Sequence, residues 1–243
     1  MNDKKLLAIM YDFYNKHTLR DQNRDIDYYI KQIKKYSAER VLVVGAGTGR
    51  VAMPLSDYAK ITGVDFDKER LEVLKAKNEN INVVCCDFIN FNSSETYDLI
   101  IIPYSTIQFC GNITKINKIF NKLNQIMTVQ TICIFDVSES FNKKPEKTEE
   151  FLFKDFCDEI KEQVEVYYSA KRYNDFIEFF IEYRLVERKY SVIEKEKYCY
   201  YDQELFSNLL NKHNLLLLKI DNGYGDNIFQ HKHVYHCRRK NER

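Results

Sequence analysis

The chain has 243 residues, and its 37 lysines and arginines almost balance its 36 aspartates and glutamates, giving a formal charge of +1. Such a chain has no overall field to attract nucleic acid or an anionic membrane surface, so we expect neither as a partner. The length suits a single domain, residues 1–243. Its seven cysteines form no C-x-x-C pair, no leader-like segment is evident, and the apolar runs are too short to cross a bilayer. We therefore expect a reduced, cytoplasmic protein.

Two helices are predicted before the core. Apolar residues recur at helical spacing over residues 4–14, with Asp3 as a candidate N-cap. A polar break at 15–23 follows, and a second amphipathic pattern covers 26–33. We expect residues 1–37 to form a helical lid over the site described below. The alternative is that the two helices only cover one face of the sheet.

The central part of the chain alternates strand and helix patterns, which predicts a parallel sheet covered on both faces. A helix and two further strands follow near the end of the chain. The expected fold class is α/β, with a doubly wound, seven-stranded Rossmann-like sheet that is mostly parallel and has an antiparallel last strand. The predicted strands are residues 41–44, 61–65, 82–86, 98–104, 131–137, 215–220 and 233–237, and the predicted helices are 50–58, 68–77, 116–127 and 203–212.

The pattern changes after residue 137. Apolar and polar residues alternate with period two from about residue 162 to 201, which predicts an antiparallel β meander inserted between strands of the sheet. Many of its apolar residues are Tyr and Phe. Cross-strand packing is the commonest reason for such a stripe. The position of the inserted region, residues 139–201, would also let it act as a cap over a substrate.

A glycine turn follows the first strand. Gly45, Gly47 and Gly49 come directly after four valine or leucine residues, and Asp65 ends the second strand twenty residues after Gly45. Glycines let the backbone approach a ligand closely, and an acidic strand tip can bind two ribose hydroxyls. The stretch therefore predicts a nucleoside-bearing cofactor. Arg50 stands where a dinucleotide fold has its third glycine, which disfavours an NAD(P)-dependent oxidoreductase but leaves it as an alternative.

The glycine order G-A-G-T-G, with Asp65 in GVDFD, Asp87 in CCDF and the segment YDLIIIPYSTIQF, resembles the small-molecule branch of the class I S-adenosylmethionine-dependent methyltransferases. The resemblance covers residues 41–137 well. It covers the C-terminal strand pair loosely, through Gly223, Gly225 and Asp226. It implies an enzyme of class EC 2.1.1 that transfers a methyl group from S-adenosyl-L-methionine to a nitrogen or oxygen of a small metabolite. An amino sugar, a nucleotide-linked saccharide or another biosynthetic intermediate is the expected acceptor.

The resemblance also implies the cofactor site. The glycine turn would lie under the amino-acid end of the cofactor, Asp65 would hold the ribose, and aromatic and acidic residues would flank the adenine. The family usually has an acidic residue where this chain has Val43, which keeps a third alternative open, a non-catalytic cofactor-binding partner subunit. The expected cofactor-binding residues are Tyr11, Gly45, Ala46, Gly47, Thr48, Gly49, Asp65, Phe66, Asp87, Phe88, Pro103 and Tyr104.

Methyl transfer requires alignment, desolvation and, for a hydroxyl acceptor, removal of a proton. Because histidine in general can act as a base near neutral pH, His17, His231 and His233 are the candidate bases. His231-x-His233 could pair on a metal, but no carboxylate partner is evident, and we expect no metal. The expected catalytic residues are these three histidines with Tyr14, Tyr104 and Gln108. The expected partner is the small-molecule acceptor, bound by a monomer or homodimer.

Overall fold

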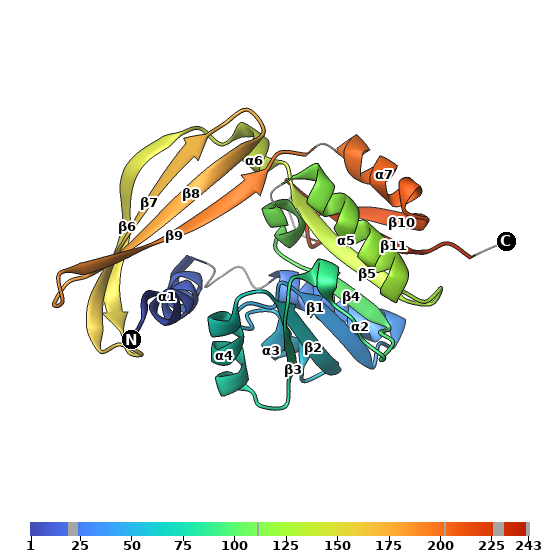
Figure 1. Cartoon of the computed structure of the whole chain (residues 1–243), viewed down its shortest axis with the longest axis horizontal. Helices are drawn as coiled ribbons and strands as arrows, with labels where there is room; N and C mark the ends of the chain where they lie inside the picture. Colours follow the sequence, from blue (N-terminus) through green and yellow to red (C-terminus); the bar gives the residue numbers. More distant parts are fainter. Residues whose placement is uncertain (19–23, 111, 202, 226–230, 242–243) are drawn as a thin grey trace.

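The chain folds around two sheets (Figure 1). The computed structural model describes residues 1–18, 24–110, 112–201, 203–225 and 231–241. The seven-stranded sheet has the order β10-β11-β5-β4-β1-β2-β3, and only β11 runs antiparallel to its neighbours. The predicted fold class is confirmed. The strands are β1 (Arg40–Val44), β2 (Lys60–Asp65), β3 (Asn82–Cys85), β4 (Leu99–Ile102), β5 (Ile132–Ser138), β10 (Leu215–Asn222) and β11 (Lys232–Arg239).

Helices cover both faces of this sheet because its strands are apolar on both sides. One face packs against α2 (Arg24–Tyr36), α3 (Ala52–Leu55) and α4 (Lys68–Lys77). The other face packs against α5 (Ile113–Ile126) and α7 (Gln203–Lys212), together with the short 3-10 helices η1 (Phe88–Asn90) and η2 (Thr106–Cys110).

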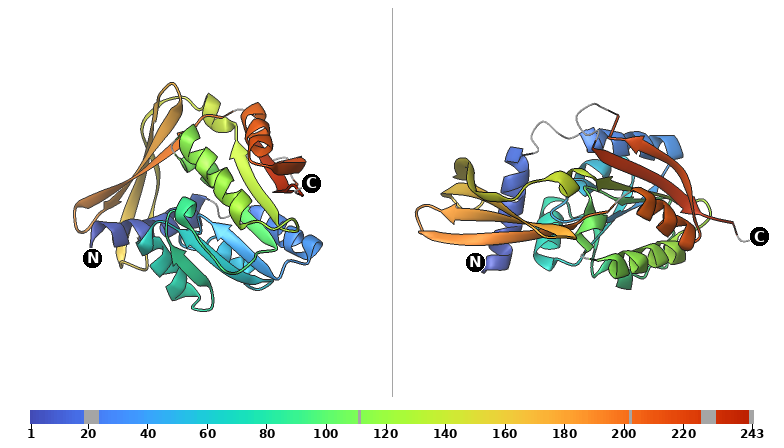
Figure 2. Two further views of the ribbon diagram at one scale, coloured as in Figure 1. Left: turned by 45° about the vertical axis from the view of Figure 1, so that its right-hand side comes forward. Right: turned by 90° about the horizontal axis from the view of Figure 1, so that it is seen from above.

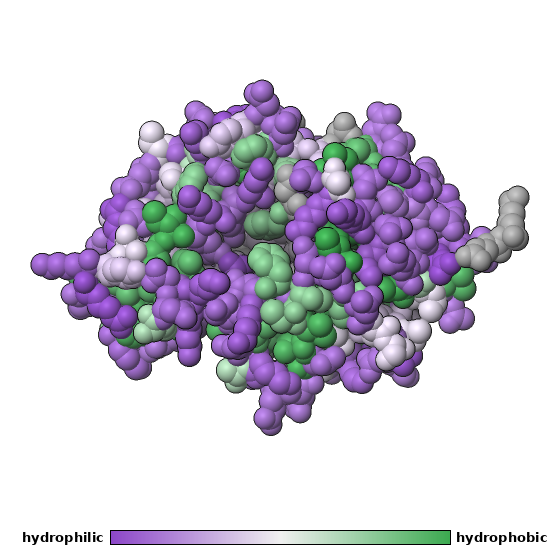
Figure 3. Space-filling model, in the orientation of Figure 1, coloured by the Kyte–Doolittle hydropathy of each residue, from purple (hydrophilic) through white to green (hydrophobic). Residues whose placement is uncertain are grey.

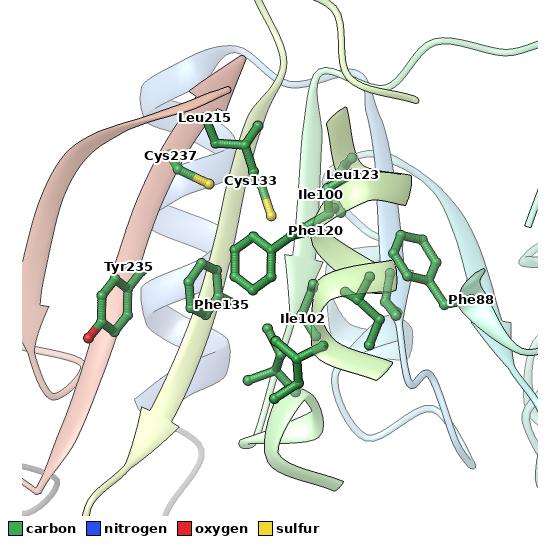
Figure 4. Close-up of a cluster of buried hydrophobic side chains, with 14 of the residues drawn as sticks. Phe88, Ile100, Ile102, Phe120, Leu123, Cys133, Phe135, Leu215, Tyr235 and Cys237 are labelled. Carbon is green, nitrogen blue, oxygen red and sulfur yellow. The ribbon is translucent and has the colours of Figure 1, made fainter. Parts of the chain in front are cut away.

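Figure 4 shows the second of these packed faces, where aromatic rings from α5, β5 and β11 meet. Phe135 stacks on Tyr235 with ring centroids 4.8 Å apart, and Phe120 meets Phe135 edge-on at 5.6 Å. Burial of such rings is the main stabilising contribution of a core. This packing fixes β5 and β11 in place. Both strands contribute residues to the site described below, namely Asp136 and Lys232.

The inserted region forms a separate four-stranded antiparallel meander, after the short helix α6 (Ser140–Lys143). Its strands are β6 (Lys147–Cys157), β7 (Glu162–Arg172), β8 (Phe176–Leu185) and β9 (Tyr190–Cys199). The predicted start at residue 162 missed β6. This strand lies at the edge, most of its side chains are exposed, and its pairing with β7 has two register shifts, so the alternation of period two is lost.

The two N-terminal helices pack in different places. α1 (Asp3–Thr18) lies against the meander, where Leu6, Met10 and Phe13 share a core with β7 and β8, whereas α2 covers the large sheet (Figure 2). Asn2, not Asp3, caps α1, because its side chain accepts a hydrogen bond from the backbone N–H of Lys5 at 2.9 Å. α1 also continues four residues beyond its predicted end. Of the predicted polar break, residues 19–23 lie outside the described residues, as does Asp226.

None of the described helices has the length and apolar character needed to span a bilayer.

Candidate functional site

The glycine turn joins β1 to β2 through its own backbone. The N–H groups of Gly45 and Ala46 donate to the carbonyl of Val64 at 2.8 and 3.1 Å. The N–H of Gly47 donates to Oδ2 of Asp65 at 2.8 Å. Gly45 and Gly47 have φ of +73° and +51°, a region that side chains rarely adopt. The turn therefore holds the Asp65 carboxylate beside it and keeps side chains out of the space above β1.

That space is a cavity of about 360 Å³ at the carboxyl ends of β1 to β4. The position is the one where open α/β sheets bind ligands, because the strand order reverses there between β1 and β4. Figure 3 shows a hollow in the middle of the molecule, between the meander and the large sheet, with apolar side chains at its floor. Eleven of the twelve expected cofactor-binding residues line this cavity: Tyr11, Gly45, Ala46, Gly47, Thr48, Asp65, Phe66, Asp87, Phe88, Pro103 and Tyr104.

Gly49 is the exception. A Cβ at this position would collide with the side chains of Leu74 and Met53, so Gly49 serves close packing of the turn against α4. Thr48 lines the cavity but its hydroxyl donates to Asp12 of α1, and Lys77 of α4 binds the same carboxylate. Thr48 and Asp12 therefore attach α1 to the glycine turn.

The acidic and aromatic residues at the strand tips differ in their burial and in the bonds they already make within the protein. The Asp65 carboxylate accepts backbone N–H groups of Gly47 and Asp67, and its burial raises its pKa. Phe66 is 77% exposed, which is unusual for so large an apolar ring. Asp87 accepts the N–H of Ile89 at 3.3 Å and forms an ion pair with Lys115 at 2.9 Å, so it caps η1 while it lines the cavity.

Val43 cannot contribute to the site, because its side chain is fully buried on the face that packs against α2. A cation lies nearby instead. Arg50 lines the cavity, and its guanidinium is fixed by two hydrogen bonds to the buried carboxylate of Asp25, at 3.0 and 2.5 Å. The guanidinium also stands 4.9 Å from the ring centre of Tyr104. The two hydrogen bonds to Asp25 fix the orientation of the Arg50 guanidinium. Its remaining N–H groups are available to a ligand in the cavity.

A strained turn follows β4. Tyr104 and Ser105 have φ of +56° and +59°, which costs conformational energy for residues with side chains. The fully buried carboxylate of Asp136 on β5 stabilises the turn. It accepts the N–H and hydroxyl of Ser105 at 2.8 and 3.1 Å, and it pairs with Lys232 of β11 at 3.0 Å. The Tyr104 ring that follows β4 contacts two cations, the guanidinium of Arg50 at 4.9 Å and Nζ of Lys232 at 4.6 Å from its centre.

A second cavity, of about 250 Å³, adjoins the first and lies under the meander. The expected residues Tyr14, Tyr104 and His231 all line it. Burial raises the pKa of Tyr14 to about 12, while burial and neighbouring lysines lower the pKa of His231. The other lining residues combine aromatic rings with polar groups: Tyr11, Asn15, Ser105, Ser138, Ser140, Lys144, Tyr168, Phe179, Ile181, Glu196, Tyr198 and Lys232.

Three expected catalytic residues lie elsewhere. His17 bonds to the carbonyl of Phe13 and to Asp155, and it stacks on Phe153, so it ties α1 to β6. His233 binds Glu139 at 3.2 Å and does not line either cavity, so it does not converge with His231. Gln108 is fully buried, and its amide makes three hydrogen bonds with the backbone of residues 138 and 199. Gln108 therefore fixes η2, and it lines neither cavity.

The sequence interpretation missed several residues that line the cavities, above all Arg50, Arg70, Lys144 and Glu196. Arg50 was noticed only as a missing glycine. One signal was available for Asp136, which is a single acid within the apolar strand ICIFDVS and therefore had to find partners inside the protein.

Comparisons with known proteins agree with this geometry. Residues 41–129 match the family model described as "Methyltransferase domain". A candidate methyltransferase of Geobacillus sp. (strain WCH70) is 25% identical over 118 residues, which are 46% of this chain and 47% of that protein. The match thus spans about half the length of that relative.

Solved structures share the fold over almost the whole chain. An S-adenosylmethionine-dependent methyltransferase from Clostridium acetobutylicum has a TM-score of 0.81 at 17% identity, covering 96% of this chain and 98% of that one. A sugar N-methyltransferase from Streptoalloteichus sp. has a TM-score of 0.77 at 13% identity, with 95% and 93% covered. An amino pentose methyltransferase from Micromonospora echinaspora has a TM-score of 0.70 at 12% identity, with 92% and 95% covered. The resemblance is confirmed: residues 41–129 match a methyltransferase domain, and the whole chain has the fold of solved S-adenosylmethionine-dependent methyltransferases.

Proposed function

We propose that the protein transfers a methyl group from S-adenosyl-L-methionine to a nitrogen or oxygen atom of a small metabolite. The observation that carries this proposal is the pair of adjoining cavities. One lies at the strand ends, where the methyltransferase domain keeps its glycine turn and Asp65, and the other lies under the aromatic meander. Tyr11, Tyr104 and Glu196 line both, so a donor and an acceptor can meet there.

The residues of the first cavity fit the cofactor. Its volume of about 360 Å³ falls in the range of small-molecule sites. A carboxylate has about four acceptor positions, and backbone N–H groups occupy two of those of Asp65, which leaves room for two ribose hydroxyls. Phe66 offers an exposed ring for the adenine. Arg50 has N–H groups beyond the two that bind Asp25, and we assign it to the methionyl carboxylate.

When bound, the cofactor supplies a methyl group on positively charged sulfur. The rings of Tyr11 and Tyr104 line both cavities, where they would suit the cationic sulfur and exclude water. Tyr104 is held rigidly by the Asp136 network, and Tyr11 is covered by the guanidinium of Arg70 at 4.0 Å from its ring centre. These contacts preorganise both rings before any ligand enters.

The second cavity supports a small acceptor with polar groups. Its volume of about 250 Å³ suits a metabolite rather than a macromolecule, and its aromatic walls carry the side chains of Lys144, His231 and Glu196. Three relatives in fold are described as acting on sugars, amino pentoses or glycopeptides. Together with the cavity, they favour an amino sugar or a nucleotide-linked saccharide as the acceptor.

Calorimetric titration with S-adenosylmethionine and its demethylated product tests the cofactor site, with Asp65→Ala as the matched variant. We expect both ligands to bind the wild type and to lose most of their affinity for the variant. Mass spectrometry of a panel of amino sugars, nucleotide-linked sugars and their hydroxyl analogues then identifies the methylated product. If the wild type binds neither ligand, the proposal is wrong. Tight binding without turnover of any acceptor favours a cofactor-binding partner subunit instead.

A further inference from the structure

The inner face of β9 carries two acidic residues where a meander usually buries apolar ones. Alternation along the strand places Val192, Glu194, Glu196 and Tyr198 on the same face. Val192 and Tyr198 are buried, and Glu194 is only 5% exposed. A carboxylate on such a face costs free energy unless a partner compensates its charge. The two glutamates differ in this respect.

Glu194 is neutralised within the protein. Arg70 of α4 forms a direct ion pair with it, and Tyr183 donates a hydrogen bond at 3.4 Å. Glu196 has no comparable partner among the described residues. It accepts one hydrogen bond, from the hydroxyl of Tyr198 at 3.2 Å, and no lysine or arginine of the described chain lies within ion-pair distance. Among the described residues Glu196 therefore lacks a direct ion-pair partner, and Arg70 and Lys144 act on it only from longer range, whereas its neighbour two positions earlier is paired directly.

Glu196 also occupies a distinctive place. With Tyr11 and Tyr104 it lines both the cofactor cavity and the cavity under the meander. The glycine turn and Asp65 fix one end of the first cavity, so the boundary between the cavities is where a methyl group must pass. A carboxylate at that boundary would lie beside the atom that receives the methyl group. A cationic acceptor would supply the missing positive charge.

We propose that Glu196 is a catalytic residue that binds the acceptor as a protonated amine and removes its proton before transfer. This inference rests on the proposed function and narrows it to basic nitrogen acceptors. The ammonium gives one proton to the Glu196 carboxylate. The electron pair that is freed on nitrogen forms the bond to the methyl carbon, while the carbon–sulfur bond breaks and leaves its electron pair on sulfur. The methylated nitrogen carries the positive charge that the sulfur loses.

The surroundings make Glu196 a stronger base than an ordinary glutamate. Burial raises its pKa, against the opposing effect of Arg70, and a carboxyl group with a raised pKa takes a proton from an amine more readily. The other groups that interact with it come from every element around the boundary. They are Tyr11 and Tyr14 of α1, Tyr104 after β4, Lys144 after α6, Tyr168 of β7, Tyr183 of β8 and Tyr198 of β9.

Sinefungin is a suitable probe, because in this cofactor analogue a carbon replaces the sulfur and an amino group replaces the methyl group that is transferred. Its ammonium group would stand at the boundary beside Glu196, whereas the demethylated cofactor has no charge there. Calorimetry compares both ligands on the wild type, on Glu196→Gln and on the control Glu178→Gln. Glu178 lies on the neighbouring strand β8 and lines neither cavity. Glutamine keeps the shape of Glu196 and can still accept the hydrogen bond from Tyr198.

We expect the wild type to prefer sinefungin. Glu196→Gln should reduce that preference by about 10- to 100-fold, the size expected for one hydrogen bond to a charged group, and should leave the affinity for the demethylated cofactor within about twofold. Glu178→Gln should change neither affinity. An unchanged preference in Glu196→Gln, or an equal loss of both ligands, would overturn the assignment of Glu196 but not the cofactor site. If the wild type binds neither ligand, the proposed function fails and this inference fails with it.

Discussion

Gly45 offers a quantitative test of the glycine turn. A Cβ added there would lie 2.5 Å from Cγ2 and 2.9 Å from Oγ1 of Thr106, and the backbone has φ of +73°. Gly47, two residues later, also has a positive φ, but a Cβ there would meet nothing closer than Tyr11 Cε1 at 3.8 Å. Alanine at Gly45 therefore suffers both strain and a collision, whereas alanine at Gly47 suffers strain alone.

The magnitudes follow from these two contributions. The left-handed conformation costs alanine about 1–2 kcal/mol at either position. Overpacking against Thr106 adds about 1–3 kcal/mol at Gly45 only. The free energy of unfolding should thus fall by about 2–5 kcal/mol in Gly45→Ala and by about 1–2 kcal/mol in Gly47→Ala. Thr106→Ser removes the nearer of the two colliding atoms and keeps the hydroxyl that binds the carbonyl of Pro103 at 2.5 Å.

Urea unfolding of the single and double variants measures these effects. Combined with Gly45→Ala, Thr106→Ser should recover part of the stability of about 1–3 kcal/mol that the collision costs, and combined with Gly47→Ala it should recover none. The reasoning is refuted if the two glycine variants lose equal stability, or if the serine substitution shows the same coupling with both.

Three further predictions concern the buried ion pair, a buried histidine and the exposed ring. Asp25→Asn leaves Arg50 without its buried partner and should lower the free energy of unfolding by about 3–5 kcal/mol in urea; a loss below about 1 kcal/mol would contradict the pairing. Burial lowers the pKa of His236 from 6.5 to about 4. The unfolded chain then binds this proton first, so stability should fall by about 3 kcal/mol as the pH drops from about 6.5 to about 4. His236→Gln should flatten that slope, and an unchanged slope would exclude His236 as its source. Phe66→Ala should leave the melting temperature unchanged but weaken cofactor binding by about 1–3 kcal/mol in calorimetry, as expected for loss of stacking on a base; unchanged affinity would remove Phe66 from the adenine site.

The alternation of strands and helices predicted the large sheet because both faces of its strands are buried, and a continuous apolar run marks such a strand clearly. The cofactor cavity was also predictable, since its residues come from strand ends that follow directly after those runs. Asp65 and Pro103 are examples, each at a position that the topology alone directs to one edge of the sheet.

The residues of the second cavity were harder to predict from the sequence. A strand pattern of period two shows that two faces exist but not which of them is inner, so Glu196 could not be distinguished from Lys195 or Lys197. Sequence alone could not rank the histidines for a related reason: His231 lines the second cavity, whereas His17 and His233 line neither. Their chemistry suits a base wherever they lie, and only the tertiary contacts of His17 and His233 show that their ring nitrogens are already used. Edge strand β6 was missed because an edge need not alternate.

The packing of α1 on the meander has a consequence for engineering. The wall of the second cavity includes Tyr11 and Tyr14 from α1 and Glu196 and Tyr198 from β9, two segments at distant places in the chain. A chimera that receives only a foreign meander would lose the apolar surface on which Leu6, Met10 and Phe13 rest. Grafts that are meant to change the second cavity should therefore exchange α1 and the meander together.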